Sequence, residues 1–436
     1  MRIGMVTACY KPVMNGVTRM ISLYKQQLEA LGHDVLIFTL GEPDPAGDEP
    51  GVVRSPGIPA GNTGYYISMR YTHEAQELLA EMEIIHCHHL FMSVEMAHRY
   101  GRCPVVYTNH TRYDLYTGAY IPIPQPTADA IMRQIWPDFT DLADVIVTPS
   151  ASVRQIMLDF GVRQPIQVIE NGVDLRPFRY PHAPLTKADL GILETATLFV
   201  YVGRLSPEKN LPLLLEQFAI AHDIAPHIHL LLIGRGTMQA ALKQQAQELG
   251  IAAAIHFTGA LEYTDIPNYL AAADAFVTAS VTEVHPLTII EAMAAGLPVA
   301  APAAPGIIDT VQPYRSGLLT HYPEQGLAAA MVGLALDAPR RQAMGDAARA
   351  DSERFDICHT VNKTVALYER LQQTRPDLRR EKAHGRWTRN RERLQPMLDQ
   401  LTGLLKPPEK RESGPLRAVQ ERKPPQNGEN RTNGEW

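Results

Sequence analysis

The sequence has few cysteines: Cys9, Cys87, Cys103 and Cys358 among 436 residues. Their spacing matches none of the close pairs with which proteins hold structural metal ions. The first three lie in or beside apolar segments, so we expect buried, reduced thiols. This pattern disfavours a disulfide framework and indicates a cytoplasmic protein.

The sequence also lacks an apolar segment long enough to cross a bilayer, which takes about 20 consecutive apolar residues. The longest uncharged stretch, residues 292–308, is interrupted by Pro298, Pro302 and Pro305. The N-terminal text MRIGMVTACY is too poor in apolar residues for a signal peptide and predicts a first strand. We therefore expect no membrane-spanning helix.

Positive charge is scarce except at the C-terminal end. The net charge is −6, but residues from Arg375 onward carry 15 Lys and Arg against 9 Asp and Glu, whereas the preceding residues carry 26 against 38. The acidic body gives no reason to expect a nucleic-acid partner. The tail, residues 375–436, is polar and rich in proline, which predicts a basic and largely disordered segment. Attraction to an anionic membrane surface is the alternative to a merely solvated tail.

Short apolar segments alternate with helical patterns along most of the chain, which predicts an α/β fold of parallel sheets covered by helices. The segment ENGVDLRPFRYPH, residues 170–182, divides them into two series. The first series is RIGMVTAC, VLIFTL, IIHCHH, PVVYTNH and VIVTPS, and the second is TLFVYVG, HLLLIG, IHFTG, AFVTAS and PVAAPA. Two doubly wound, Rossmann-like domains follow, and ligands of such sheets bind outside the carboxyl ends of the strands.

Two loops that follow predicted strands carry residues suited to phosphate. KPVMNGVTRM precedes a helix whose N-terminus favours an anion, and its Asn15 and Gly16 tolerate a tight turn. GRLSPEKN places Arg204 and Lys209 five positions apart, and two cations there would suit a diphosphate. A solvated loop that is basic by chance explains this octapeptide equally well.

Two other kinds of site are disfavoured. In the loop IGRGTMQ, Gly234 and Gly236 are followed by Gln239, where a dinucleotide fingerprint requires its last glycine, so an NAD-dependent oxidoreductase is not favoured. The cluster HCHH, residues 86–89, has no carboxylate or cysteine partner at ligand spacing, and the chain has no Asp-x-Asp. We therefore expect no metal site and no cofactor.

The stretch SVTEVHPLTIIEAMAAGLPVAA carries two glutamates eight positions apart. AFVTAS before it predicts a strand, Pro286 suits the first position of a helix, and Gly296 suits its end. Glu283 then lies in the loop at the end of the strand, and Glu291 lies one turn into the helix. Each glutamate alone is more often a surface group, but beside two cations such a pair suits a sugar attached to a diphosphate.

The motifs GRLSPEKN, Glu-x7-Glu, IIEAMAAGLPV and VIENGVD together resemble the GT-B retaining glycosyltransferases of family 4, over residues 1–373. The segment HCHHLFMSVEMAHRYGRCPVVYTNHTRYDLY is similar to the acceptor domain of bacterial diacylglycerol glucosyltransferases. The second resemblance rests on His86, His88, His110, Tyr113 and Tyr116.

The resemblance implies a role for each matching residue. It implies that the donor is bound by Gly16, Arg204, Lys209, Leu287, Thr288 and Glu291, with the two cations on the diphosphate and Glu291 on the ribose. It implies catalytic roles for His110 and Glu283, both facing the transferred sugar, although His110 could instead be a buried structural histidine. It implies that His88, Tyr113 and Tyr116 bind the acceptor and that Asn171 and Asp174 belong to a structural segment between the domains.

Three residues depart from the family pattern. Pro286 stands where the family has glycine and removes one backbone donor, and His285 stands where the family has an aromatic residue. Asn15 replaces the first glycine of the usual pair. These departures leave the donor class as implied but the conformation of the phosphate loop open.

The resemblance implies a GT-B enzyme with four parts: an acceptor-binding domain, residues 1–175; a donor-binding domain facing it across a cleft, residues 176–355; a crossover helix, residues 356–374; and the tail. The hypothesis is a cytoplasmic, peripherally membrane-associated hexosyltransferase. It would move a hexose, with glucose as the expected sugar, from a nucleotide diphosphate sugar to a lipid hydroxyl such as that of diacylglycerol. A soluble or polysaccharide acceptor is the alternative within the fold, and a non-catalytic nucleotide-sugar binding protein is the alternative outside enzymes.

A lipid acceptor would have to be reached from the membrane surface, where aromatic side chains settle at headgroup level. The aromatic residues expected near the cleft of the first domain are Tyr65, Tyr66, Tyr71, Tyr116, Tyr120 and Trp136. For any one of them, packing in the core is the alternative.

Overall fold

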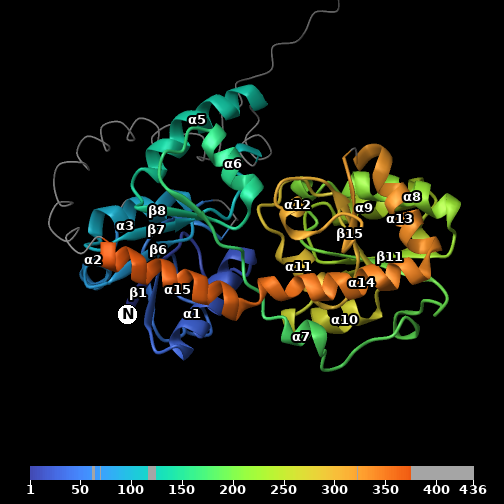
Figure 1. The fold of residues 1–436 in the computed structure, drawn as a ribbon, viewed down its shortest axis with the longest axis horizontal. Coiled ribbons are helices and arrows are strands. Elements are labelled where there is room, and N and C mark those ends of the chain that lie inside the picture. Colours follow the sequence, from blue (N-terminus) through green and yellow to red (C-terminus); the bar gives the residue numbers. More distant parts are fainter. Residues whose placement is uncertain (61–63, 69, 116–123, 322, 375–436) are drawn as a thin grey trace, which may run out of the picture. The chain divides into compact units, whose positions relative to one another are not determined.

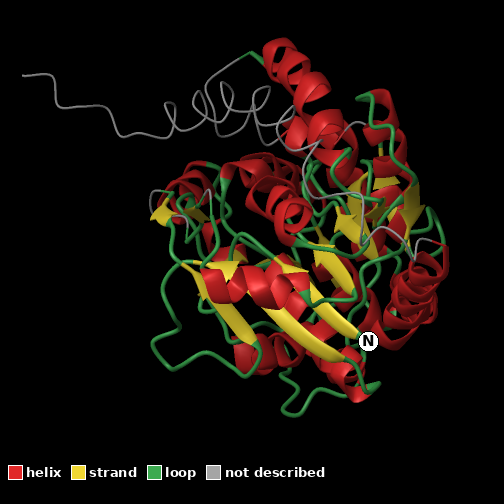
Figure 2. Ribbon diagram, turned by 90° about the vertical axis from the view of Figure 1, so that its left-hand side faces the viewer, coloured by secondary structure: helices red, strands yellow, loops and turns green. Residues whose placement is uncertain are grey.

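The computed structural model describes residues 1–60, 64–68, 70–115, 124–321 and 323–374. The predicted disordered tail lies outside these residues, and so do Tyr116 and Tyr120. Within them the chain forms two parallel sheets covered by helices, which confirms the predicted α/β class. In Figure 2 the strands, in yellow, run between red helices.

The first sheet has seven strands in the order β3-β2-β1-β6-β7-β8-β9, all parallel. Its strands are β1 (Arg2–Val6), β2 (Asp34–Leu40), β3 (Val52–Ser55), β6 (Ile84–Cys87), β7 (Val105–Thr108), β8 (Val145–Thr148) and β9 (Ile166–Val168). A short antiparallel pair, β4 (Ile58–Pro59) and β5 (Tyr66–Ile67), lies between β3 and β6 in the chain.

The second sheet has six parallel strands in the order β12-β11-β10-β13-β14-β15. Its strands are β10 (Thr197–Val202), β11 (Ile228–Ile233), β12 (Ile255–Gly259), β13 (Ala275–Val277), β14 (Val299–Pro302) and β15 (Gly317–Thr320). Every residue of β10 is buried, and its side chains alternate between two apolar clusters: Phe199 and Tyr201 in one, Leu198 and Val200 in the other. Burial on both faces explains why this strand is an unbroken apolar run.

The sequence segments predicted as strands all form strands. The prediction missed the short antiparallel pair of β4 and β5, and it missed β3, β9 and β15, which lie at edges of the two parallel sheets and are largely half-buried. An edge strand has a neighbour on one side only, so its sequence needs less apolar character and gives a weaker signal.

Helices connect most successive strands of the two parallel sheets. In the first half they are α1 (Gly16–Ala30), α2 (His73–Ala80), α3 (Glu95–Tyr100), α5 (Gln125–Thr140) and α6 (Ala151–Asp159). In the second half they are α7 (Arg176–Arg179), α8 (Leu211–Ile224), α9 (Gln239–Glu248), α10 (Ile266–Ala272), α11 (Leu287–Ala294), α12 (Ile307–Thr310), α13 (Pro323–Leu336) and α14 (Ala338–Ser352). The last described helix is α15 (Ile357–Thr374).

The last helix returns to the first sheet. Figure 1 shows α15 lying beside α1, and Ile357, Val361 and Tyr368 of α15 share an apolar cluster with Ile3 and Met5 of β1. Residues that are more than 350 positions apart therefore form one core.

The chain crosses between the two sheets twice. The two crossing segments, one at Val173 and one at residues 355–357, lie against each other. The Val173 amide donates to the Phe355 carbonyl at 2.9 Å, and the Ile357 amide donates to the Val173 carbonyl at 3.1 Å. A Cβ atom on Gly172 would lie 2.4 Å from Thr360 Oγ1, so only glycine permits this approach. The motif ENGVD is thus explained by close packing between chain segments.

Two of the aromatic residues expected near the membrane lie in the core instead. Tyr71 is 2% exposed and Trp136 is fully buried, so for these two residues the alternative of packing in the core is confirmed and a place at the cleft surface is wrong. Tyr65 and Tyr66 are half-buried. Among the described helices, none combines the length and apolar character that crossing a membrane requires.

The attachment of α15 gives a test of the fold. Tyr368 Oη and His86 Nδ1 lie 2.5 Å apart, and both side chains are buried. We expect Tyr368→Phe to lower the free energy of unfolding by about 1–3 kcal/mol, because it leaves a buried ring nitrogen without a partner. Urea unfolding followed by circular dichroism measures the loss. Tyr180→Phe, at a tyrosine that is 77% exposed, is the control and should change the midpoint little. Equal midpoints for both variants would contradict the role of this contact.

Candidate functional site

The strand order places a crevice at the same point of each sheet. From β1 the chain builds outward to β3 and then returns to β6 on the other side of β1, and from β10 it builds outward to β12 and returns to β13. Such reversals open a crevice between loops at the carboxyl ends of the two central strands. The loops after β10 and β13 contain GRLSPEKN and SVTEVHP, and the loop after β1 contains KPVMN.

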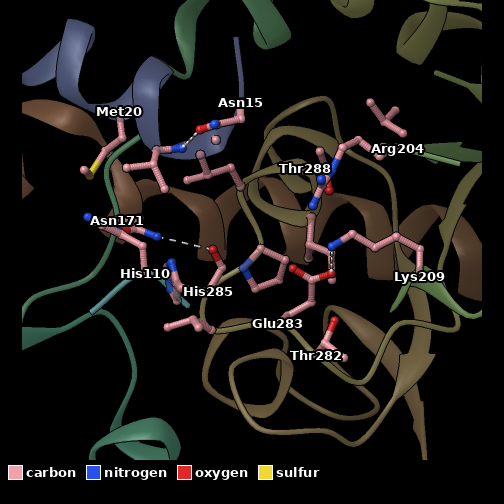
Figure 3. A pocket seen from close by; sticks show the side chains of 18 of the residues that line it. Asn15, Met20, His110, Asn171, Arg204, Lys209, Thr282, Glu283, His285 and Thr288 are labelled. Carbon is pink, nitrogen blue, oxygen red and sulfur yellow. Dashed lines mark hydrogen bonds and ion pairs between the residues drawn. The ribbon is translucent and has the colours of Figure 1, made fainter. Parts of the chain in front are cut away.

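A cavity of about 490 Å³ is lined by residues of these loops from both halves of the chain. Seven predicted site residues line it: Gly16, His110, Arg204, Lys209, Glu283, Leu287 and Thr288. Figure 3 shows several of these side chains around the cavity. Glu291, His88 and Tyr113 are not among the lining residues of the described chain.

The loops after β10 and β13 are joined by an ion pair. Lys209 Nζ lies 2.7 Å from Glu283 Oε1, which also accepts a hydrogen bond from Ser280 Oγ at 2.7 Å. Burial alone would raise the pKa of Glu283, but the Lys209 ammonium and these hydrogen bonds hold that pKa below its ordinary value. Glu283 is therefore a carboxylate at neutral pH, despite its burial.

Arg204 is held differently. Its side chain is 60% exposed, and its Nη2 lies 2.9 Å from Glu208 Oε1, a buried carboxylate of the same loop. Ser206 Oγ donates to the same Glu208 oxygen at 2.7 Å. The loop thus carries two cations at the cavity, one largely buried and one mostly in solvent.

The helix that follows β13 begins one residue later than predicted. Pro286 is the N-cap, and α11 starts at Leu287. The first amides of a helix have no intrahelical acceptor, and among the described residues no side chain caps α11. Leu287 and Thr288 both line the cavity, so this helix N-terminus contributes positive potential there.

The N-terminus of α1 is already capped. Asn15 Oδ1 accepts hydrogen bonds from the amides of Val17 at 2.9 Å and Thr18 at 3.0 Å. These two amides are therefore engaged, and the anion site expected at this helix end is weaker than the sequence alone indicated. Gly16 lies beside α11, and a Cβ added there would be 3.6 Å from Leu287 Cδ1, an ordinary van der Waals contact.

Glu291 is enclosed by two residues that the sequence did not single out. Tyr263 Oη donates to Glu291 Oε1 at 3.0 Å, and Arg19 Nη1 of α1 lies 3.7 Å from the same oxygen. The Arg19 guanidinium also lies over the Tyr263 ring, 3.3 Å from its centroid. Burial raises the pKa of Glu291, because the charge of Arg19 and the Tyr263 hydrogen bond only partly offset desolvation. Arg19 was missed because one cation on an amphipathic helix looks like a solvated surface residue.

His285 packs as an aromatic side chain. Its ring meets that of Phe355 edge to face with centroids 5.0 Å apart, and neither ring nitrogen has a hydrogen-bond partner among the described residues. Burial lowers its pKa to about 4, so the ring is neutral. Its carbonyl accepts a hydrogen bond from Asn171 Nδ2 at 3.3 Å, which ties the ENGVD segment to the cavity loop.

Two of the predicted acceptor residues, His88 and Tyr113, lie in the described part of the chain. His88 is buried behind His110, with Nδ1 3.2 Å from His110 Nε2. Tyr113 accepts a hydrogen bond at its hydroxyl from the Leu90 amide at 3.2 Å, and its ring packs edge to face on Phe91. Tyr116 lies outside the described residues. Of the two predicted acceptor residues that the structure describes, His88 is buried and Tyr113 is half-buried, and neither lines the cavity.

No cluster of three or more metal-ligating side chains occurs in the described part of the chain. Cys9, Cys87 and Cys103 are buried as predicted, whereas Cys358 is exposed.

The sequence matches two family models, one in each half. The model described as glycosyltransferase family 4 matches residues 14–176, and the one described as glycosyl transferases group 1 matches residues 184–351. An alpha-monoglucosyldiacylglycerol synthase of Streptococcus pneumoniae is 30% identical over 352 residues, covering 78% of this chain and 79% of the relative. The chain belongs to the family 4 glycosyltransferases. The predicted family and enzyme class are confirmed.

Two further comparisons place this glycosyltransferase more broadly. A D-inositol 3-phosphate glycosyltransferase of Geodermatophilus obscurus is 29% identical over 310 residues, which are 68% of each chain. The crystal structure of Anabaena HepE, in complex with UDP and glucose, matches with a TM-score of 0.67 and 22% identity over 86% of this chain and 100% of HepE. The structural match confirms the predicted GT-B fold.

The Lys209–Glu283 pair gives a test within the site. We expect Lys209→Met to lower the free energy of unfolding by up to about 3–5 kcal/mol, because it leaves a mostly buried carboxylate without its cation. The double variant Lys209→Met/Glu283→Gln should recover most of this loss, since a neutral amide still accepts from Ser280. Urea unfolding of the single and double variants at pH 7 measures the coupling.

The same pair predicts a pH dependence. Because the folded pKa of Glu283 lies below its unfolded value, the pair stabilises the fold above the ordinary glutamate pKa of about 4.3, and this stabilisation is lost as pH falls through the lowered value. The difference in free energy of unfolding between the original chain and the double variant should therefore become smaller as the pH falls through this lowered pKa. A double variant as unstable as Lys209→Met at pH 7 would contradict the assignment.

Proposed function

We propose that this glycosyltransferase moves a hexose, glucose in the first instance, from a nucleoside diphosphate sugar to a lipid hydroxyl such as that of diacylglycerol. The Streptococcus relative is named as a monoglucosyldiacylglycerol synthase, and HepE holds UDP and glucose in a related fold. The observation that carries the proposal is that two cations, a carboxylate and a histidine from the other half line one cavity: Arg204, Lys209, Glu283 and His110.

The cations suit the diphosphate of the donor. Arg204 can offer two parallel N–H donors, Lys209 a point charge, and the N-terminus of α11 the amides of Leu287 and Thr288. Together they would neutralise the leaving nucleoside diphosphate without a metal ion, and we propose that none is required. Gly16 would contribute by letting the loop of the first half approach the phosphates.

Glu283 suits the sugar. It stays ionised beside Lys209, so a negative charge lies next to the positive ones, where positive charge would develop on the sugar as the phosphate leaves. We propose that the acceptor attacks from the face that the diphosphate leaves, with retention of configuration, and that His110 hydrogen-bonds the sugar.

Glu291 is proposed to bind the ribose, which would have to compete with Arg19 for this carboxylate. Its Oε2 is buried without a partner among the described residues, and its Oε1 faces Tyr263 and Arg19. Ribose hydroxyls would satisfy the unpaired oxygen and would compete with Arg19 for the other. Donor binding would thus exchange a contact between the halves for a contact with the ligand.

The acceptor assignment rests on the relatives. We propose Tyr113 and Tyr116 on the acceptor side, while the burial of His88 argues against its direct contact with an acceptor. A soluble phosphorylated polyol is a second candidate acceptor, because the Geodermatophilus relative is named for D-inositol 3-phosphate.

The donor and acceptor are tested together. We expect radiolabelled sugar from UDP-glucose, rather than UDP-galactose or GDP-mannose, to appear in a lipid product when diacylglycerol is supplied in mixed micelles. Arg204→Ala should raise the KM for the donor about ten- to hundredfold, because it removes a charged hydrogen-bond partner worth about 1.5–3 kcal/mol. Arg340→Ala, at an exposed arginine of α14, is the matched control.

Two outcomes would count against these assignments. Efficient transfer to inositol 3-phosphate with none to diacylglycerol would replace the lipid acceptor with the soluble one. A donor KM that is the same in Arg204→Ala and Arg340→Ala would remove Arg204 from the donor site.

We further propose that the enzyme binds anionic membrane surfaces peripherally from the cytoplasm, through the excess of Lys and Arg from Arg375 onward. Each basic residue near such a surface contributes about 1 kcal/mol. We expect salt-sensitive sedimentation with vesicles containing anionic lipid, weakened by truncation after Gln373 and further by changing Tyr116 and Tyr120 to serine. Vesicles of neutral phosphatidylcholine are the control. Binding that ignores both salt and truncation would contradict an electrostatic anchor.

A further inference from the structure

Four histidines gather at the ends of β6 and β7, and only one of them lines the cavity. His86, His88 and His89 come from the HCHH segment, and His110 follows β7. His110 lines the cavity, whereas the other three are buried away from its walls as the described residues form them. The question is what the buried rings do for the one at the surface.

His88 is the ring in direct contact with His110. The two rings stack with centroids 5.5 Å apart and planes 17° apart, and His88 Nδ1 lies 3.2 Å from His110 Nε2. Burial and the neighbouring histidines lower the pKa of both rings well below the ordinary value. Both imidazoles are therefore neutral near pH 7, and each carries a single N–H.

The two other buried histidines of this group, His86 and His89, form their hydrogen bonds with residues other than His88. His86 lies close, with its ring centroid 4.3 Å from that of His88, but its Nδ1 is 2.5 Å from Tyr368 Oη and its Nε2 is 2.6 Å from Thr108 Oγ1. His89 Nδ1 lies 3.0 Å from Thr7 Oγ1 and accepts from the Ala8 amide. His88 Nε2 is buried without a hydrogen-bond partner among the described residues.

This environment selects one tautomer of the pair. If His110 donated to His88, the proton of neutral His88 would stand on Nε2 as a buried donor with no acceptor. Orphaned buried N–H donors are rarer in proteins than under-satisfied acceptors. The favoured arrangement has His88 Nδ1–H donating to His110 Nε2, which places the proton of neutral His110 on Nδ1.

We propose that His88 is a positioning residue that fixes His110 as the neutral Nδ1–H tautomer, so that His110 offers the cavity a hydrogen-bond donor and not a base. An oxygen of the ligand, such as a sugar hydroxyl, would accept from this N–H. Only this last step rests on the proposed function, because the tautomer is a property of the protein alone. The burial of His88 is thereby explained without contact between His88 and an acceptor.

The tautomer can be measured directly on the full chain. With ¹⁵N-labelled histidine, long-range ¹⁵N–¹H spectra near pH 7 distinguish the two neutral forms, and the spectrum of His110→Gln assigns the His110 signals. We expect His110 to be protonated at Nδ1. In His88→Phe, which keeps a stacking ring but removes the donor, we expect the Nε2–H form of His110 to become populated.

Two results of this measurement would overturn the proposal: protonation of His110 at Nε2 in the unmodified chain, or the same His110 tautomer in His88→Phe. Neither depends on the identity of the substrate, so a failed glycosyl-transfer assay would leave this test standing.

Kinetics provide a second readout that separates positioning from packing. Asparagine can place its amide nitrogen near the position of a histidine Nδ1, whereas glutamine reaches toward the position of Nε2. With UDP-glucose and diacylglycerol micelles, we expect His88→Gln and His88→Phe to lower kcat about tenfold, equivalent to one hydrogen bond, with little change in donor KM. His88→Asn should restore kcat to within about threefold of the unmodified chain.

The ranking of the three variants decides the outcome. Equal losses in all three, with equal thermal unfolding midpoints, would show that the donor at Nδ1 does not matter and would contradict the proposal. If a His88 variant does not fold, the tautomer of His110 measured in the unmodified chain still tests the proposal.

Discussion

The ion pair between Lys209 and Glu283 holds together the two loops that make the site. The loops leave adjacent parallel strands, β10 and β13, at the point where the strand order reverses. Two further hydrogen bonds join them: Thr282 Oγ1 donates to the Glu208 carbonyl at 3.2 Å, and Asn210 Nδ2 donates to the Ala279 carbonyl at 3.4 Å. The charge-assisted contact at 2.7 Å between Lys209 and Glu283 links the loops and keeps the Glu283 carboxylate ionised in a mostly buried place. Opposite charges a few ångströms apart suit a reaction in which negative and positive charge separate as one bond breaks. The pair therefore serves both to organise the loops and to set the potential of the cavity.

Helices α1 and α6 of the first half contact helices α11 and α12 of the second. On one side Gly16 and Arg19, one turn apart on α1, face Leu287 and Glu291, one turn apart on α11. A second contact joins α6 to α12, where the Ser152 amide donates to the Asp309 carboxylate at 3.2 Å. Each of these contacts involves polar or small side chains, and such interfaces exchange partners more readily than apolar ones. Of these residues, Gly16 and Leu287 line the cavity, so the contact between α1 and α11 lies at its wall.

Most of the fold could be predicted from the sequence, because strands buried on both faces leave long apolar runs and their loops carry glycine and proline. The residues of GRLSPEKN and the glutamate of SVTEVHP were also predictable, since they follow strands whose ends must meet. Roles that depend on how deeply a side chain is buried were not predictable. His88 and His110 both end strands, and only the packed structure shows that one lies behind the other.

Contacts between distant segments were equally out of reach of the sequence. Arg19 meets Glu291 only because α1 lies beside α11 in the folded chain, and no local pattern records that arrangement. Trp136 and Tyr71 look suited to a membrane surface in sequence, but aromatic residues carry the same signal whether they line a surface or fill a core. His285 shows the reverse case, in which a polar residue occupies an aromatic position by packing on Phe355 and staying neutral.

The return of α15 to the first sheet sets an order for biosynthesis. The ribosome delivers β1 first, yet the apolar face of β1 is completed by Ile357, Val361 and Tyr368, which emerge last among the described residues. Domains generally fold as they leave the ribosome, from the N-terminal end. Here the second sheet has all its strands before the first sheet has its full cover, so the half that is translated first is the half that finishes folding last.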